Sequence, residues 1–162
     1  MFAKIVSYFY FTTDAMHESL CLKVSRIPRL WRAVIDQRLA PLGMTHTRWV
    51  TLYHLWRHGD GQAQCDLART IGVEAPSLVR TLDQLGQQGL IERRASEEDR
   101  RTKLIFLTPE ATPLLEQIER AVNDARADML KDISETDLDR FEQTLSRIES
   151  NGSRELSLRD DQ

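Results

Sequence analysis

The residues best suited to chemistry are two arginines in the run SEEDRRTKL at residues 96–104. Arg100 and Arg101 follow three acidic residues, at what the pattern indicates is the tip of a short hairpin. A guanidinium is weakly hydrated and is attracted to the narrow, negative minor groove of A·T-rich DNA. We expect Asp99 to fold back on an arginine or on a backbone amide and so brace the tip. Taken alone, the run is equally typical of a charge-balanced surface turn.

A second polar set has the spacing of one helix face. Its members recur at i, i+3, i+4 and i+7, and they are Ser77, Arg80, Thr81 and Gln84. A leucine stripe lies opposite, at residues 78, 82 and 85. Arginine reads guanine, glutamine reads adenine, and hydroxyls bind base edges or phosphates. An ordinary solvated face would carry more Glu and Lys, so the stripe favours double-stranded DNA as the partner.

The elements that hold these side chains form a recognisable series. QAQCDLARTIGV indicates a short helix stopped by Gly72, and EAPSLVRTLDQLGQQG indicates a second helix, over about 75–88, with Pro76 in its first turn. Two helices around a glycine turn predict a helix-turn-helix. LIERR and KLIFLT then read as two strands flanking the polar tip. The series predicts a winged helix-turn-helix.

Helical segments flank this unit on both sides. Apolar spacing predicts a helix over about 18–39, which Pro28 should interrupt, and another after Thr45 as its N-cap. A long helix should follow Thr108, and SETD at 134–137 resembles a capping box for a last helix. The fold class is therefore mostly α with a small β-hairpin wing (α+β). The expected division is an N-terminal extension (1–17), an N-terminal dimerisation region (18–44), the winged helix (45–108), C-terminal dimerisation helices (109–150) and a flexible tail (151–162).

Composition restricts the class of protein. The chain has 162 residues and a net charge of −3, but residues 109–162 carry −7 and the rest +4, so an anionic partner is compatible with the total. No apolar run reaches the ~18 residues of a membrane span. We find no phosphate-binding glycine loop or hydrolase motif, so we expect no enzyme and no cofactor. Two cysteines are too few for a disulfide framework, which favours the cytoplasm.

The first residues, MFAKIVSYFYFTTDA, imitate a secretory signal poorly, because they contain two tyrosines and no clean cleavage site. We interpret them as an extension outside the core. Translation could start at Met1 or at Met16.

Three stretches of the chain together resemble the MarR family of winged-helix regulators, and most closely its SlyA-like branch. They are LWRAVIDQRLAPLGMTHTRWVTL, LARTIGVEAPSLVRTLDQLGQQGLIERR and DRRTKLIFLT, and the resemblance covers about residues 20–150. It implies an obligate homodimer on A·T-rich inverted repeats, with the recognition helices in successive major grooves and the wings in flanking minor grooves. Pro76, Ser77 and Arg80 carry over as recognition-helix contacts, and Arg100, Arg101 and Asp99 as wing residues, Arg101 being the inserted one.

The resemblance also implies a ligand cleft between the dimerisation helices and the winged helix. There a small aromatic carboxylate such as salicylate would weaken DNA binding. Trp31, Arg32, Trp49 and His54 fall near this region, although the two tryptophans are more readily explained as core residues. SlyA-like regulators act as activators or repressors that oppose nucleoid-associated silencers, often at virulence genes. The resemblance therefore implies a nucleoid-associated protein.

Other chemistry stays open at this point. Cys21 could sense oxidants, but the tyrosines that activate a cysteine in the peroxide-sensing branch are replaced by Ser25 and Ile35. Cys65 is at most a secondary oxidation site. His54 and His58 are spaced like a zinc pair, but two ligands do not make a site, so we predict no metal. The remaining alternative is a winged helix that binds protein.

Overall fold

The computed structural model describes the backbone of residues 2–160 and the side chains of residues 19–157. The chain divides into two compact units, one up to Arg126 and one from Ala127 onward. Along the chain, the elements up to the second strand are α1 (Phe2–Leu39), η1 (Ala40–Leu42), α2 (His46–His58), β1 (Gln62–Ala63), α3 (Gln64–Ile71), α4 (Ala75–Gln87) and β2 (Ile91–Ala95). The rest are β3 (Lys103–Leu107), η2 (Pro109–Ala111), α5 (Thr112–Met129) and α6 (Glu135–Asp160). This confirms a mostly α fold that carries a hairpin wing.

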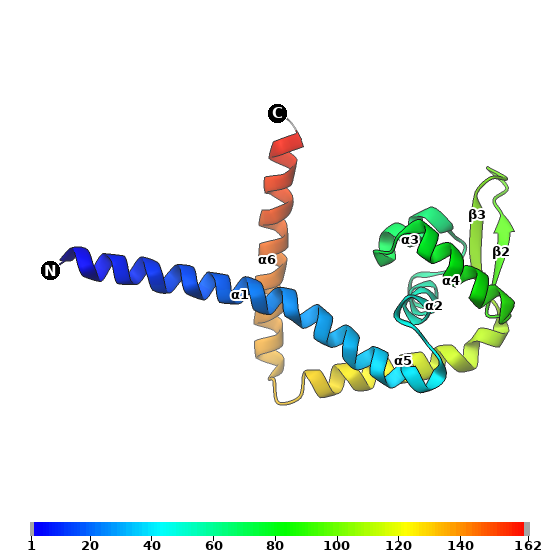
Figure 1. Ribbon diagram of the computed structural model, residues 1–162, viewed down its shortest axis with the longest axis horizontal. Helices are drawn as coiled ribbons and strands as arrows, with labels where there is room; N and C mark the ends of the chain where they lie inside the picture. Colours follow the sequence, from blue (N-terminus) through cyan, green and yellow to red (C-terminus); the bar gives the residue numbers. More distant parts are fainter. Residues whose placement is uncertain (1, 161–162) are drawn as a thin grey trace. The chain divides into compact units, whose positions relative to one another are not determined.

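The hairpin belongs to a three-stranded antiparallel sheet with the order β1-β3-β2. Ile91 pairs with Leu107 at the base, and Ala95 pairs with Lys103 near the tip. The hairpin stands out from the helices at one side of the first unit (Figure 1). The added strand β1 pairs only Gln62 and Ala63 with β3. Because it has two residues, no alternating pattern marks it in the sequence.

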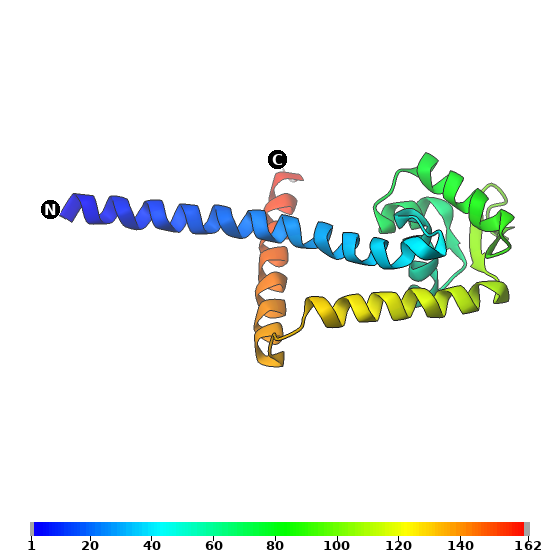
Figure 2. The ribbon, with the colours of Figure 1, turned by 60° about the horizontal axis from the view of Figure 1, so that its bottom comes forward.

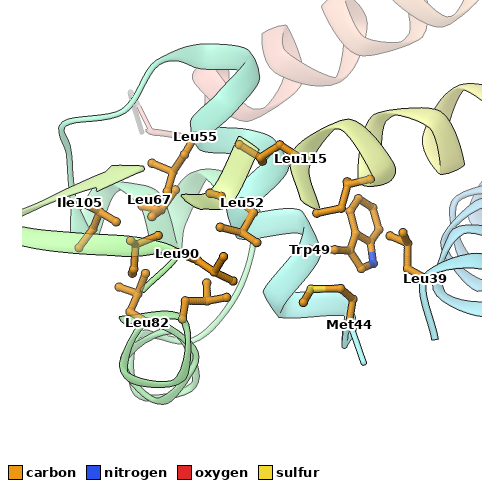
Figure 3. Close-up of a cluster of buried hydrophobic side chains, with 14 of the residues drawn as sticks. Leu39, Met44, Trp49, Leu52, Leu55, Leu67, Leu82, Leu90, Ile105 and Leu115 are labelled. Carbon is orange, nitrogen blue, oxygen red and sulfur yellow. The ribbon is translucent and has the colours of Figure 1, made fainter. Parts of the chain in front are cut away.

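The core of the first unit is built mainly from leucines of five helices, together with Ile105 of β3. Figure 3 shows side chains of α1, α2, α3, α4, β3 and α5 turned toward one another. Leu52, Leu67, Leu78 and Leu85 are fully buried, as is Ile105 of β3. Each such side chain stabilises the fold by about 1.5–3 kcal/mol through lost contact with water. This core fixes α4 and the wing to one scaffold.

Two helices begin at the predicted positions. Thr45 is the N-cap residue of α2, as predicted. Before α6, the backbone amide of Asp137 donates to the Ser134 hydroxyl at 3.2 Å, and that hydroxyl donates to the Asp137 carboxylate at 2.7 Å, so Ser134 caps the helix as the SETD pattern predicts. α5 runs back from the hairpin beside the last turns of α1 (Figures 1 and 2).

The interruption predicted at Pro28 is wrong, because α1 is continuous from Phe2 to Leu39 with Pro28 inside it. Proline removes one helical hydrogen bond, but on an exposed helix water can satisfy the carbonyl that loses its donor. The backbone of residues 2–17 forms the first turns of the same helix. Their side chains lie outside the described residues.

The second unit contains α6, which is exposed along nearly its whole length. The sequence predicts a loose tail from residue 151, whereas α6 continues to Asp160. No proline interrupts the segment, and Arg, Glu and Leu are good helix formers. Residues 161–162 lie outside the described residues.

Candidate nucleic-acid interface

The helix α4 carries the polar face that the sequence singles out. Its leucine stripe is confirmed, since Leu78, Leu82 and Leu85 are at most 1% exposed. Pro76 lies in the first turn, where its missing N–H has no helical partner to lose. The residues exposed on the other side include Pro76, Ser77, Arg80 and Gln84. One cation, one amide and one hydroxyl are therefore presented to solvent from a rigid helix.

Thr81 does not share that face, and the prediction that it does is wrong. Its side chain is 7% exposed, and its hydroxyl donates to the Ser77 carbonyl at 3.1 Å. At 100° per residue, Thr81 lies only roughly 70° from the centre of the leucine stripe. It therefore falls at the edge of the buried side. A hydroxyl bonded within its own helix has no need of an outside partner.

The wing tip is held by Asp99. One carboxylate oxygen accepts the backbone N–H of Arg101 at 3.0 Å, and the other accepts the Thr102 hydroxyl at 2.9 Å. The Asp99 carbonyl also accepts the Thr102 N–H at 2.9 Å. Of the two partners considered from the sequence, Asp99 thus engages a backbone amide. Arg100 and Arg101 are both exposed on this tight turn.

The space beside the wing adds residues that sequence reasoning did not assign to the site. Arg101 and Lys103 line an open hollow with Gln64 and Cys65 of α3, with a volume of about 220 Å³. No acid lines it among the residues that the structure describes there. The first turn of α3 therefore meets the cationic edge of the wing. Only the three-dimensional fold brings these positions together.

The base of the wing is anchored to the loop before β1. Gly61 has a φ of +74°, and a Cβ there would lie 3.1 Å from the Phe106 ring. A side chain would thus be disfavoured by both backbone conformation and space. Asp60 accepts the backbone N–H of Leu107 at 3.1 Å. These contacts hold β3, and with it the wing, against α2.

The four residues expected near a ligand cleft lie in different surroundings. Trp49 is a core residue whose indole N–H donates to Asp36 at 2.7 Å, while Trp31 packs on the edge of the core. Arg32 is exposed, and the His54 ring lies 3.1 Å from the amide oxygen of Gln62. A hollow of about 520 Å³ does lie close by, between α1, η1 and α5. Its lining comprises Arg38, Leu39, Pro41, Leu42, Gln117, Arg120, Ala121 and Asp124.

Cys21 and Cys65 are free thiols on the exposed surface. His54 and His58 stack with their ring centroids 4.7 Å apart. Within residues 19–157, no group of three or more His, Cys, Asp or Glu side chains is placed to hold a metal ion. In the same part of the chain, no helix is long and apolar enough to span a membrane.

Comparison with known proteins places this geometry in a family. The sequence profile of the MarR family matches residues 44–103. The solved structure of transcriptional regulator PA3341 is 42% identical, with a TM-score of 0.76 over 83% of this chain and 98% of that chain. CouR from Rhodococcus jostii RHA1, solved with p-coumaroyl-CoA bound, is 26% identical, with a TM-score of 0.68 over 80% and 90%.

A structure of the transcriptional regulator SlyA is 20% identical, with a TM-score of 0.70 over 84% of this chain and 95% of that chain. At that identity the likeness concerns the fold alone. The match at 42% identity covers 83% of this chain, which is more than the winged helix alone. The chain therefore belongs to the MarR family of DNA-binding transcriptional regulators.

Proposed function

We propose that this regulator binds A·T-rich inverted repeats as a homodimer, with α4 in the major groove and the wing in the flanking minor groove. The observation that carries the proposal is the exposed face of α4. Ser77, Arg80 and Gln84 extend from a helix whose opposite side is sealed into the core. Side chains on a fixed helix reach base edges with little loss of entropy, which favours sequence reading. Such a protein would act in the cytoplasm, on the nucleoid.

Each exposed residue has a role that its chemistry suits. Arg80 would pair with a guanine through two hydrogen bonds, and Gln84 with an adenine. Pro76 and Ser77, in the first turn, would contact the backbone or a base edge. Thr81 is left out of this set because it is buried.

In the wing, Arg101 would enter the minor groove and Arg100 would contact phosphate, while Asp99 keeps the turn tight. The two hydrogen bonds that the Asp99 carboxylate accepts support this, because they order the turn before DNA arrives. A pre-ordered turn loses less entropy on binding. Arginine suits the groove better than lysine, since it sheds water more readily.

The dimer is supported by apolar side chains that the first and last helices leave exposed. On α1, Leu20, Leu22, Ile27 and Leu30 are 41–64% exposed. On α6, Phe141, Leu145 and Ile148 recur at i, i+4 and i+7 and are 36–48% exposed. Burying such stripes against a second copy would remove them from water. The dimer would present two α4 helices to half-sites ~34–36 Å apart.

The SlyA-like branch suggests control by a small aromatic carboxylate such as salicylate, and activation or repression by competition with other DNA-bound proteins. Arg38 and Arg120 in the hollow between α1, η1 and α5 would suit a carboxylate. Leu39, Pro41 and Leu42 would suit an aromatic ring. The p-coumaroyl-CoA complex of CouR supports an aromatic acyl ligand in this fold.

Selection of random duplexes by the purified protein, followed by sequencing, tests the proposal. We expect an A·T-rich inverted repeat with its half-site centres one helical turn apart. Addition of salicylate should then release the selected duplex. Recovery of no common sequence would overturn the DNA-reading proposal and favour the alternative of a protein partner. A single unrepeated site would overturn the dimer.

A further inference from the structure

Arg93, on strand β2, reaches across to the recognition helix α4. Its Nη1 lies 2.6 Å from a carboxylate oxygen of Asp83. Its Nη2 donates to the Val79 carbonyl at 3.2 Å. Val79 and Asp83 are one turn apart, so one planar guanidinium spans a full turn of α4. The strand that begins the wing is thereby linked directly to the helix that would read DNA.

The pleat of β2 explains why Arg93 and not its neighbour makes this link. Ile91 and Arg93 point to the same side, and Ile91 is buried against the core. Arg94 points the other way, where its guanidinium lies 4.4 Å from the Phe106 ring centroid and pairs with Glu92. The Arg93 side chain is 31% exposed and that of Arg94 60%. Two adjacent arginines of equal charge thus differ in their contact with α4.

The carboxylate that Arg93 binds is the only acid on α4, and it lies close to the residues that would contact DNA. Asp83 precedes Gln84 and follows Arg80 by three residues, which puts it within side-chain reach of Arg80. A free Asp83 could pair with Arg80 and draw it away from a base. It would also repel phosphate. The ion pair with Arg93 occupies one carboxylate oxygen of Asp83 and offsets its charge, which opposes both effects.

We infer that Asp83 and Arg93 form a positioning pair that fixes the orientation of α4 against the wing and keeps Arg80 available for DNA. The inference rests on the proposed function, since it concerns how the same surface achieves selectivity. The pair need not touch DNA. It acts through Arg80 and through the relative placement of α4 and β2, which decides whether both can enter adjacent grooves. Loss of the pair should therefore reduce discrimination between sequences more than affinity for DNA in general.

The test measures binding to the selected inverted repeat and to a scrambled duplex at one salt concentration. Asp83→Ala and Arg93→Ala should each lower the preference for the repeat about tenfold. The double variant should lose no more than either single variant, because both remove the same interaction. Arg94→Ala is the matched control, and it should change the binding of both duplexes by the same factor. Asp83→Asn, which keeps the shape of the side chain, replaces Asp83→Ala if the latter melts early.

The sign of the Asp83→Ala effect separates positioning from simple charge. If Asp83 acted only by repelling DNA, its removal would tighten both duplexes and leave the preference unchanged, which would overturn the inference. Losses that multiply in the double variant would overturn it as well. If the wild-type protein itself shows no preference between the duplexes, the proposed function fails and the positioning role falls with it. A wild-type preference that survives Asp83→Ala contradicts the positioning pair alone.

Discussion

The winged helix and the terminal helices differ in how far their apolar side chains are buried. In the winged helix, leucines of α2, α3 and α4 are almost completely buried, and the side chains that α4 leaves exposed are mostly polar. On α6 the pattern is reversed, since Phe141 is 47% and Ile148 48% exposed. A region whose apolar side chains are already buried within one protomer is free to use its surface for an outside ligand. A region that leaves apolar side chains in water is expected to bury them against another chain.

The largest effect is expected when the exposed apolar side chains of the terminal helices are removed. A Phe141→Asp/Ile148→Asp variant should dissociate the dimer, because each apolar side chain lost from both subunits removes roughly 3–6 kcal/mol of burial. Sedimentation at micromolar concentration should then detect monomers, with DNA affinity at least 100-fold weaker. Ser146→Asp adds the same kind of charge on the same helix and should stay dimeric. A dimeric double variant would show that α6 is not at the interface.

A smaller effect is expected on the side of the winged helix. Arg80→Ala should cost ~1–3 kcal/mol at one base position and relax the preference there, because a two-bond contact to guanine is lost. A binding series over all single-base changes in the repeat measures this. Thr81→Val, at a buried neighbouring position, should leave the base preference unchanged. Equal losses on every sequence would remove Arg80 from base reading.

The wing should contribute less to DNA affinity than α4, and its contribution should depend on the sequence of the flanks. Arg101→Ala should weaken binding by about tenfold on A·T-rich flanks and less on G·C-rich flanks, because only the former offer a narrow negative groove. Arg100→Ala should weaken both flanks alike, as a phosphate contact does. Anisotropy on duplexes that differ only in the flanks distinguishes the two. Indifference of Arg101→Ala to the flanks would contradict a minor-groove role.

The smallest effect is expected from removal of residues 1–15. The match to the solved structure of PA3341 covers 98% of that chain but only 83% of this one. The family fold therefore does not require every residue of this chain. The shortened protein should keep its dimer and its DNA affinity within about twofold. Sedimentation and anisotropy on the full-length and shortened proteins, side by side, measure both. A monomeric shortened protein would show that the first turns of α1 contribute to the dimer interface.

Local signals in the sequence were enough to predict the winged helix. The leucine stripe of α4 and the tight polar turn at Asp99 each depend on residues within a few positions of one another, so spacing reveals them. The prediction for Thr81 was wrong because helical spacing does not decide whether a residue at the edge of the leucine stripe is buried. Packing against the neighbouring elements decides it. The prediction for Pro28 was wrong because it assumed that the carbonyl which loses its N–H donor stays unsatisfied. On an exposed helix, water can bind that carbonyl. The pair of Asp83 and Arg93, and the strand β1, depend on contacts between distant positions and carry no local signal.

The winged helix should read DNA only when the terminal helices pair two copies, and this is the central claim. Fluorescence anisotropy at fixed salt, on an A·T-rich inverted repeat, a single half-site and a scrambled duplex, tests it most directly. We expect wild-type protein to prefer the full repeat by about 100-fold over the scrambled duplex, within the range of sequence-specific binding. The Phe141→Asp/Ile148→Asp variant should lose most of that preference. Equal wild-type affinity for the repeat and the half-site, or for the repeat and the scrambled duplex, would contradict the claim.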